Sequence, residues 1–320
     1  WANQRLFSFD GSAGAPPDAF SESGHNWQLP AYRWDVLRDE GYAWFGARAR
    51  RAADLFDLFR VDHVVGLFRS WIFPRDGSPP HFEPAGEAAQ IAQGEAVLKV
   101  LMQAGAGVIA EDLGTIPDFV RSALAALGLP GYRVLRWERC WNEPGQPLIN
   151  PAEYPRRSVA TTGTHDTETL AVWWQGADDA ERQAALTVAA TAWRDQPPPS
   201  VGGEMLQPAV RDAILEALFA SGSDLLTLPI QDVFGWPDRV NVPGLIDDAN
   251  WTWRLPWPVD ELEAQPEAVE RQRADADAAR AARFRPEGDR GVCRFTRAAD
   301  YSASERLGCP TGSTSSSNST

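Results

Sequence analysis

Cysteine and histidine are scarce in this sequence of 320 residues, which contains three cysteines and four histidines. The cysteines, Cys140, Cys293 and Cys309, show neither a CxxC pair nor the Cys/His spacing of a structural zinc site. No His-x-His pair occurs either. This supply of ligands favours neither a disulfide framework nor a metal centre, and the thiols are predicted to be reduced, in a cytoplasmic protein.

Long apolar runs and clusters of basic residues are also missing. No run approaches the roughly 18 apolar residues that a membrane-spanning helix needs, and the N-terminus resembles no signal peptide. The net charge of −14 argues against a nucleic-acid partner, because phosphate binding needs clustered Lys and Arg. A neutral or cationic small molecule is the expected ligand, with no membrane and no nucleic acid. The chain begins without an initiator Met, which favours a fragment of a longer protein.

Tryptophan, in contrast, is abundant, with 14 residues. Core packing explains most of them. The alternative is that several line a groove and stack on a sugar or another ring-shaped ligand. Trp27, Trp71 and Trp257 stand in Pro- or Gly-rich contexts, which favours a groove for some of them.

Strands and helices alternate along most of the chain. Strands are predicted over residues 58–62, 107–110, 132–137, 158–162 and 224–229. Helices are predicted over residues 42–56, 86–104, 117–127, 167–174, 180–193, 209–220 and 261–283, with Pro117 and Gly128 marking the ends of the third. This alternation predicts right-handed βαβ units and a parallel sheet.

Three of the predicted strands end in an acidic residue beside a histidine or a second acid. In a (β/α)₈ barrel such strand ends converge on one face, and that face carries the active site. The stretch Arg60–His63 taken alone is equally compatible with an edge strand that bears a surface ion pair. Its repetition at three strand ends favours the barrel. The three pairs are Asp62-His63, Glu111-Asp112 and His165-Asp166.

Two carboxylates in different environments are the minimum equipment for cleaving a glycosidic bond with retention. One attacks the anomeric carbon and the other protonates the departing oxygen, so the acid needs a raised pKa while the nucleophile stays ionised. Arg60 lies two residues before Asp62 on the same strand face, where it could hold that carboxylate in its charged form. His63 and His165 could donate hydrogen bonds to sugar hydroxyls.

Six stretches, in this order, resemble the 4-α-glucanotransferases (amylomaltases or disproportionating enzymes) of glycoside hydrolase family 77. They are APPDAFSESGHNWQLPAYRWD (15–35), FRVDHVVGLFRSWIFP (59–74), VIAEDLGTIPDFV (108–120), GYRVLRWE (131–138), TTGTHDTETLAVWW (161–174) and LPIQDVFGWPDRVNVPG (228–244). The resemblance covers the chain from its first residue to about Pro258. It implies a (β/α)₈ barrel of the α-amylase clan that transfers glucan segments through a covalent intermediate, with no cofactor. The implied partners are α-1,4-glucans and glucose.

The resemblance also implies a role for each matching residue. Asp62 becomes the nucleophile, Glu111 the general acid/base, and Asp166 the third carboxylate, which binds sugar hydroxyls and stabilises the transition state. The implied substrate-binding residues are Arg60, His63, His165, Trp27 on a mobile loop over the active site, and Asn241 near the donor sugar.

The same resemblance implies how the chain is divided. In the family, the Trp-Ala-Asn motif of residues 1–3 lies beyond the third barrel strand, so strands equivalent to four to eight are expected here, in a barrel truncated at its N-terminal side. The barrel region is predicted over residues 1–262 with a loop insertion at 12–35, followed by a charged helix over 263–287. A low-complexity and disordered tail is predicted over 288–320. Two departures, at residues 24–28 and at Thr167, concern the loop and the acceptor preference more than the reaction.

Four other functions share features with glucan transfer. A metal-dependent hydrolase with Asp62-His63 and His165-Asp166 as ligands needs more histidines than the chain has. A non-catalytic glucan-binding module needs no trio of strand-end acids. A hydrolase of the α-amylase type shares barrel and carboxylates and differs in its products. An inactive glucan-binding fragment is the expectation if the missing strands are needed for catalysis.

Overall fold

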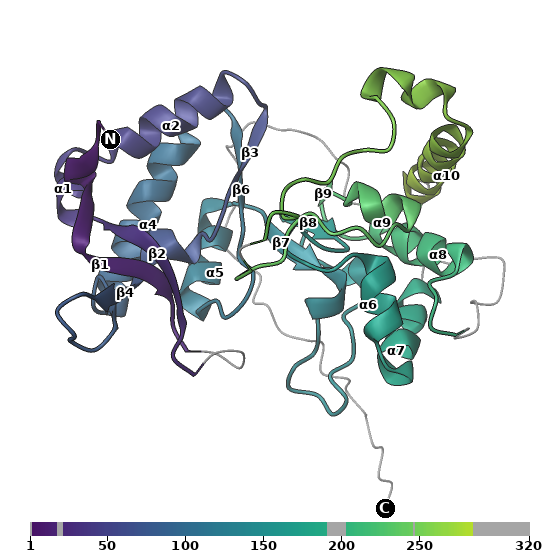
Figure 1. Cartoon of the computed structure of the whole chain (residues 1–320), viewed down its shortest axis with the longest axis horizontal. Coiled ribbons are helices and arrows are strands. Elements are labelled where there is room, and N and C mark those ends of the chain that lie inside the picture. The colour runs from purple at the N-terminus through teal and green to yellow at the C-terminus, as the bar shows by residue number, and fades with distance from the viewer. Residues whose placement is uncertain (1, 18–21, 191–202, 246, 284–320) are drawn as a thin grey trace, which may run out of the picture. The chain divides into compact units, whose positions relative to one another are not determined.

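The computed structural model describes residues 2–17, 22–190, 203–245 and 247–283 (Figure 1). The chain divides into two compact units, whereas one barrel region was predicted over residues 1–262: unit 1 comprises residues 1–132 and 157–159, and unit 2 comprises residues 133–156 and 160 onward. The tail predicted over 288–320, the end of the charged helix beyond 283 and residues 191–193 lie outside the described residues. Among the helices that are described, none combines the length and the apolar character that crossing a membrane requires.

Unit 1 contains a four-stranded antiparallel sheet that sequence analysis missed. Its order is β2-β1-β4-β5, with bounds Phe7–Ala15 for β1, His25–Tyr32 for β2, Ser70–Pro74 for β4 and His81–Glu83 for β5. Much of the segment 12–35, expected as a loop insertion, is therefore paired strand. Gly14 marks the pairing, because a Cβ atom there would lie 2.1 Å from the carbonyl oxygen of His25.

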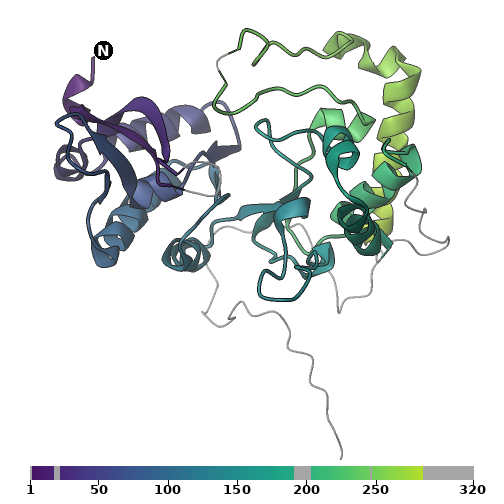
Figure 2. The same cartoon turned by 60° about the horizontal axis from the view of Figure 1, so that its bottom comes forward.

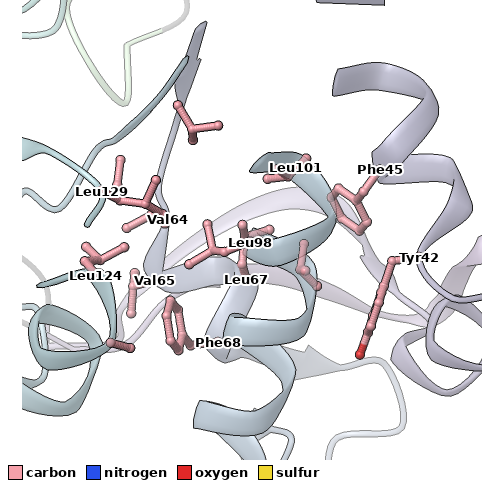
Figure 3. Packing of buried hydrophobic residues seen from close by; sticks show 14 of the residues in the cluster. Tyr42, Phe45, Val64, Val65, Leu67, Phe68, Leu98, Leu101, Leu124 and Leu129 are labelled. Atoms are coloured by element: carbon pink, nitrogen blue, oxygen red, sulfur yellow. The ribbon is translucent and has the colours of Figure 1, made fainter. Parts of the chain in front are cut away.

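The core of unit 1 is built from helices that pack around the short helix α3, Val65–Phe68. Val65 and Phe68 lie between α4 (Glu87–Met102), which carries Leu98, and α5 (Asp118–Leu127), which carries Leu124 (Figure 3). Gly94 makes this packing possible, because a Cβ atom there would lie 2.2 Å from the Phe68 ring. The α3–α4 contact therefore supports the chain directly after Asp62-His63.

Parallel strands of unit 1 run beside one another as the alternation predicted. β3 (Leu58–Val61) pairs with β6 (Gly107–Ala110), and β6 meets the start of β7 (Gly131–Val134) at Ala110 and Gly131. The predicted strand 132–137 is too long, because residues 135–137 form a 3₁₀ turn in which Glu138 N–H donates to the Val134 carbonyl. β3 ends directly before Asp62 and β6 ends directly before Glu111, as predicted.

The strands β7, β8 and β9 are neighbours in this order. All four residues of β8 (Ser158–Thr161) are buried. β9 is only Leu225–Leu226, shorter than the predicted strand 224–229, because α9 (Ile230–Phe234) starts directly after Pro229. Helices α6 (Leu170–Gly176), α7 (Asp179–Ala190) and α8 (Pro208–Phe219) form the core of unit 2, and α10 (Pro266–Arg283) lies along α8 (Figure 2).

Most predicted helices are present with shifted ends. α5 keeps its predicted stop, since Gly128 caps it in the left-handed conformation at φ 69°. The helix predicted over 42–56 is α2, Ala43–Ala53. The short helix α1, Trp34–Asp39, was not predicted. The charged helix begins at Pro266, after a 3₁₀ turn over Val259–Ala264.

A buried carboxylate, Asp232 of α9, joins three elements of unit 2. It is 1% exposed, its Oδ2 accepts the Thr162 hydroxyl at 2.5 Å and its Oδ1 accepts the Leu170 N–H at 2.6 Å. Burial raises the pKa of Asp232, and these two hydrogen bonds and Arg136 oppose the rise. Asp232 therefore holds the end of β8 to the start of α6, on either side of the segment that carries His165 and Asp166.

Asp232→Ala should lower the free energy of unfolding by about 2–4 kcal/mol, because two buried donors lose their acceptor. Asp232→Asn should cost less, since it keeps the shape and one acceptor. The measurement is urea-induced unfolding of the purified protein. Asp238→Ala, which removes an exposed carboxylate nearby in the sequence, is the control and should leave the midpoint unchanged. Equal midpoints for Asp232→Ala and the parent would contradict the structural role.

Candidate active site

Asp62 lies in the turn between β3 and α3, where β3 leaves the core. Its side chain is 73% exposed, and its Oδ1 accepts a hydrogen bond of 2.5 Å from Nη2 of Arg60. The same Nη2 lies 3.9 Å from Oε2 of Glu111. One guanidinium nitrogen therefore faces both carboxylates, which brings Arg60, Asp62 and Glu111 together as predicted for the strand ends.

Glu111 is held rigidly at the end of β6. Its Oε2 accepts the His63 N–H and its Oε1 accepts the Leu113 N–H, both at 2.7 Å. The backbone is tied as well, because Glu111 N–H donates to the Val61 carbonyl and Val64 N–H donates to the Glu111 carbonyl. These four bonds fix the carboxyl group against the turn that carries Asp62.

Burial sets the protonation of Glu111. The residue is 8% exposed, and this burial raises its pKa. The N–H groups of Leu113 and His63 and the charge of Arg60 oppose the rise, while the charge of Asp62 adds to it. A buried carboxyl with a raised pKa beside an exposed carboxylate is the division of environments that acid and nucleophile require.

His63 and Trp27 lie against each other beside this pair. The backbone of His63 has a positive φ of 46°, which is uncommon outside glycine. The Trp27 ring of β2 packs edge-on against it, with centroids 4.9 Å apart and an interplanar angle of 86°. Burial lowers the pKa of His63, and Asp62 opposes this. A neutral imidazole can both donate and accept hydrogen bonds.

Two residues near Glu111 have roles that the sequence did not predict. Asp112, the second acid at the end of β6, is 3% exposed and accepts the Tyr132 N–H at 2.7 Å, so it fixes the start of β7. The Tyr132 ring in turn supports Arg60, whose guanidinium carbon lies 5.2 Å from its centroid. The acidic dipeptide marked the strand end, but only side-chain contacts separate Glu111 from Asp112.

Unit 2 carries the third predicted carboxylate, Asp166, in the segment between β8 and α6. The side chain of Asn241 donates from Nδ2 to Asp166 Oδ1 at 2.6 Å. Arg239 donates to the Asp166 carbonyl at 3.0 Å, and the Asn241 N–H donates to the His165 carbonyl at 3.2 Å. The structure therefore brings Asp166, His165 and Asn241 together. The prediction that Asp166 shares one face with Asp62 and Glu111 stays a prediction.

Arg239 also reaches Glu168, which sequence analysis did not select. Its Nη1 lies 3.9 Å from Glu168 Oε2, and Glu168 Oε1 accepts from buried Arg136 at 3.0 Å. The arginine at 239 thus links the backbone of Asp166 to a second acid of the same segment. No residue spacing indicates this link, because more than 70 residues separate Arg239 from Asp166.

A metal-binding cluster is not found in the described regions. Within residues 2–17, 22–190, 203–245 and 247–283, no three His, Cys, Asp or Glu side chains form a group that could hold a metal ion. The groups described above are instead organised by arginine, asparagine and backbone N–H donors.

The sequence is similar to a known protein family over most of its length. The model of glycoside hydrolase family 77, described as 4-alpha-glucanotransferase, matches residues 1–260. The chain belongs to this family. It is 35% identical over 274 residues to the 4-alpha-glucanotransferase of Chlamydia muridarum, which covers 82% of the chain and 50% of that relative. It is 33% identical over 271 residues to the enzyme of the same name from Thermus thermophilus, covering 80% of the chain and 50% of the relative. The family member described here thus spans about half the length of these curated relatives.

Solved structures of amylomaltases share the fold. The amylomaltase from Streptococcus agalactiae, in complex with acarbose, superposes with a TM-score of 0.69 at 23% identity, over 88% of this chain and 54% of that one. The amylomaltase from Corynebacterium glutamicum gives a TM-score of 0.67 at 27% identity, over 84% of this chain and 42% of that one. The chain has the family 77 fold of the α-amylase clan.

Proposed function

We propose that this protein is a 4-α-glucanotransferase, which moves a segment of an α-1,4-glucan to the 4-hydroxyl of glucose or of another glucan. Membership of the family supports the reaction class, as do the names of the relatives. The proposal includes a cytoplasmic location, which rests on three cysteines without a disulfide pattern. It also takes β3, β6, β7, β8 and β9 as barrel strands four to eight, because they neighbour one another in chain order.

The proposed mechanism is a retaining double displacement. Asp62 attacks the anomeric carbon while Glu111 protonates the departing oxygen, and Glu111 then deprotonates the incoming 4-hydroxyl as it attacks the glycosyl-enzyme. The single observation that carries this mechanism is the position of Arg60 Nη2, 2.5 Å from Asp62 and 3.9 Å from Glu111. Both carboxyl groups thus lie near the same guanidinium nitrogen, which is compatible with the about 5–5.5 Å that separates the two carboxyl groups of retaining enzymes.

The remaining predicted residues bind the sugar in this proposal. Asp166, oriented by Asn241, accepts hydrogen bonds from sugar hydroxyls and stabilises positive charge at the anomeric carbon. His63 and His165 donate to hydroxyls, and the exposed Trp27 stacks on the glucan chain. A stacked chain also excludes water, which favours transfer over hydrolysis.

The products formed from maltotriose test this function. The protein, in its full encoded length, is incubated with maltotriose, and the products are separated by chromatography. Transfer yields glucose together with maltotetraose and longer chains, whereas an α-amylase-type hydrolase yields glucose and maltose without longer chains. If only hydrolysis products form, the protein is a hydrolase and not a transferase. Unchanged maltotriose, at every concentration and pH tested, would overturn the proposal.

A further inference from the structure

Trp251 is an exposed tryptophan with an unusual backbone. Trp251 is 58% exposed, and its backbone φ of 65° lies in the left-handed region. A bulky residue is rarely found there, and such outliers persist only where the surrounding structure holds them. Single exposed hydrophobic residues are common on protein surfaces, so exposure by itself indicates nothing. The backbone and the neighbours of Trp251 carry the argument.

Hydrogen bonds hold Trp251 in this conformation. Its N–H donates to the Val240 carbonyl at 2.8 Å, and its carbonyl accepts from Arg254. The preceding residue, Asn250, closes the loop, because its Oδ1 accepts the Val242 N–H at 3.0 Å and its Nδ2 donates to the Leu245 carbonyl at 2.8 Å. These bonds thus hold the Trp251 backbone in place, while more than half of the surface of the residue stays exposed.

The indole is presented next to the residues that surround Asp166. Its ring centroid lies 5.1 Å from that of His165, at an interplanar angle of 41°. Val240, which anchors the Trp251 backbone, directly precedes Asn241, whose side chain binds Asp166. A flat apolar face therefore adjoins the imidazole of His165, whose chain neighbour Asp166 accepts the Asn241 amide. This combination suits a pyranose, which has an apolar C–H face and hydroxyls around its rim.

We propose that Trp251 is a stacking platform for a glucosyl unit of the α-1,4-glucan, beside His165 and Asp166. This inference rests on the proposed function, since it takes a glucan as the ligand of the Asp166 group. Trp251 binds the chain and takes no part in bond cleavage. Its contribution therefore belongs to glucan affinity and to KM, while kcat stays close to that of the parent protein.

Binding of maltoheptaose, measured by isothermal titration calorimetry, tests the platform. All variants carry Asp62→Asn, so that no turnover disturbs the titration. Trp251→Ala should weaken binding about fivefold to tenfold, whereas Trp251→Phe, which keeps a flat ring, should stay within about threefold of the parent. Both replacements keep an L-residue at the same positive φ, so the backbone strain is matched.

Trp141 provides the control. It is 59% exposed, nearly the same as Trp251, and it lies on the turn that follows Arg139. Trp141→Ala should leave maltoheptaose affinity unchanged, and the melting temperatures of all variants should agree. Equal affinity of Trp251→Ala and the parent would overturn the platform and leave the transferase standing. A parent that binds no maltoheptaose at all would overturn both proposals.

Discussion

Asp62→Asn is expected to abolish glucan transfer from maltotriose, lowering kcat by about 10⁴-fold or more. The amide has the shape of the carboxylate but cannot form the glycosyl-enzyme. Arg60 loses its charged partner while Glu111 keeps both backbone donors, so the fold should persist. Glucose release from maltotriose measures the loss. In the parent, a slowly reacting fluorinated glucosyl donor should leave a covalent adduct on the peptide that contains Asp62.

Asp35→Asn is the matched control for this variant. Asp35 is also an exposed carboxylate paired with an arginine two residues earlier, since Arg33 donates to it at 3.2 Å. Its replacement should leave transfer unchanged. Substantial transfer by Asp62→Asn, or an adduct on a different carboxylate, would show that Asp62 is not the nucleophile.

Glu111→Gln is expected to lower transfer from maltotriose by about 10²- to 10⁴-fold, the usual contribution of a general acid/base. The loss should be much smaller in the first step with α-glucosyl fluoride, because fluoride departs without a proton. This difference between donors separates loss of the acid from loss of the fold. Glu95→Gln, which changes a half-buried glutamate paired with Lys99 in α4, is the control and should behave as the parent.

The pH profile supplies a second test of Glu111. Burial raises the pKa of its carboxyl group, and Asp62 adds to this, against the opposing effects of Leu113, His63 and Arg60. The protonated form is the acid that cleaves the bond, so the rate should fall as pH rises through this pKa. The alkaline limb should therefore lie above the pKa of an ordinary glutamate, and it should vanish with α-glucosyl fluoride in Glu111→Gln. If the alkaline limb persists in Glu111→Gln, the group that causes it is not Glu111.

The parallel strands and their acidic ends could be predicted because the signal is local. An apolar run that stops at ionisable residues shows where a strand leaves the core, since burying those charges unpaired is costly. Asp62 and Glu111 each follow such a strand, and both lie near Arg60. The antiparallel sheet of unit 1 could not be predicted in the same way. β1 contains glycines and alanines without β-branched residues, and it pairs with β4 about 60 residues away.

The sequence by itself determined the family, the order of the motifs and the residue types available for catalysis. Tertiary structure alone decided which members of those motifs lie together at Arg60 and which hold the neighbouring backbone in place. Glu111 and Asp112 are adjacent acids, yet the first lies near Arg60 and the second accepts the Tyr132 N–H. Asn241 and Trp251 join the Asp166 group only through contacts across 75 and 86 residues of chain. Such long-range contacts depend on how the elements pack, and no periodicity in the sequence records them.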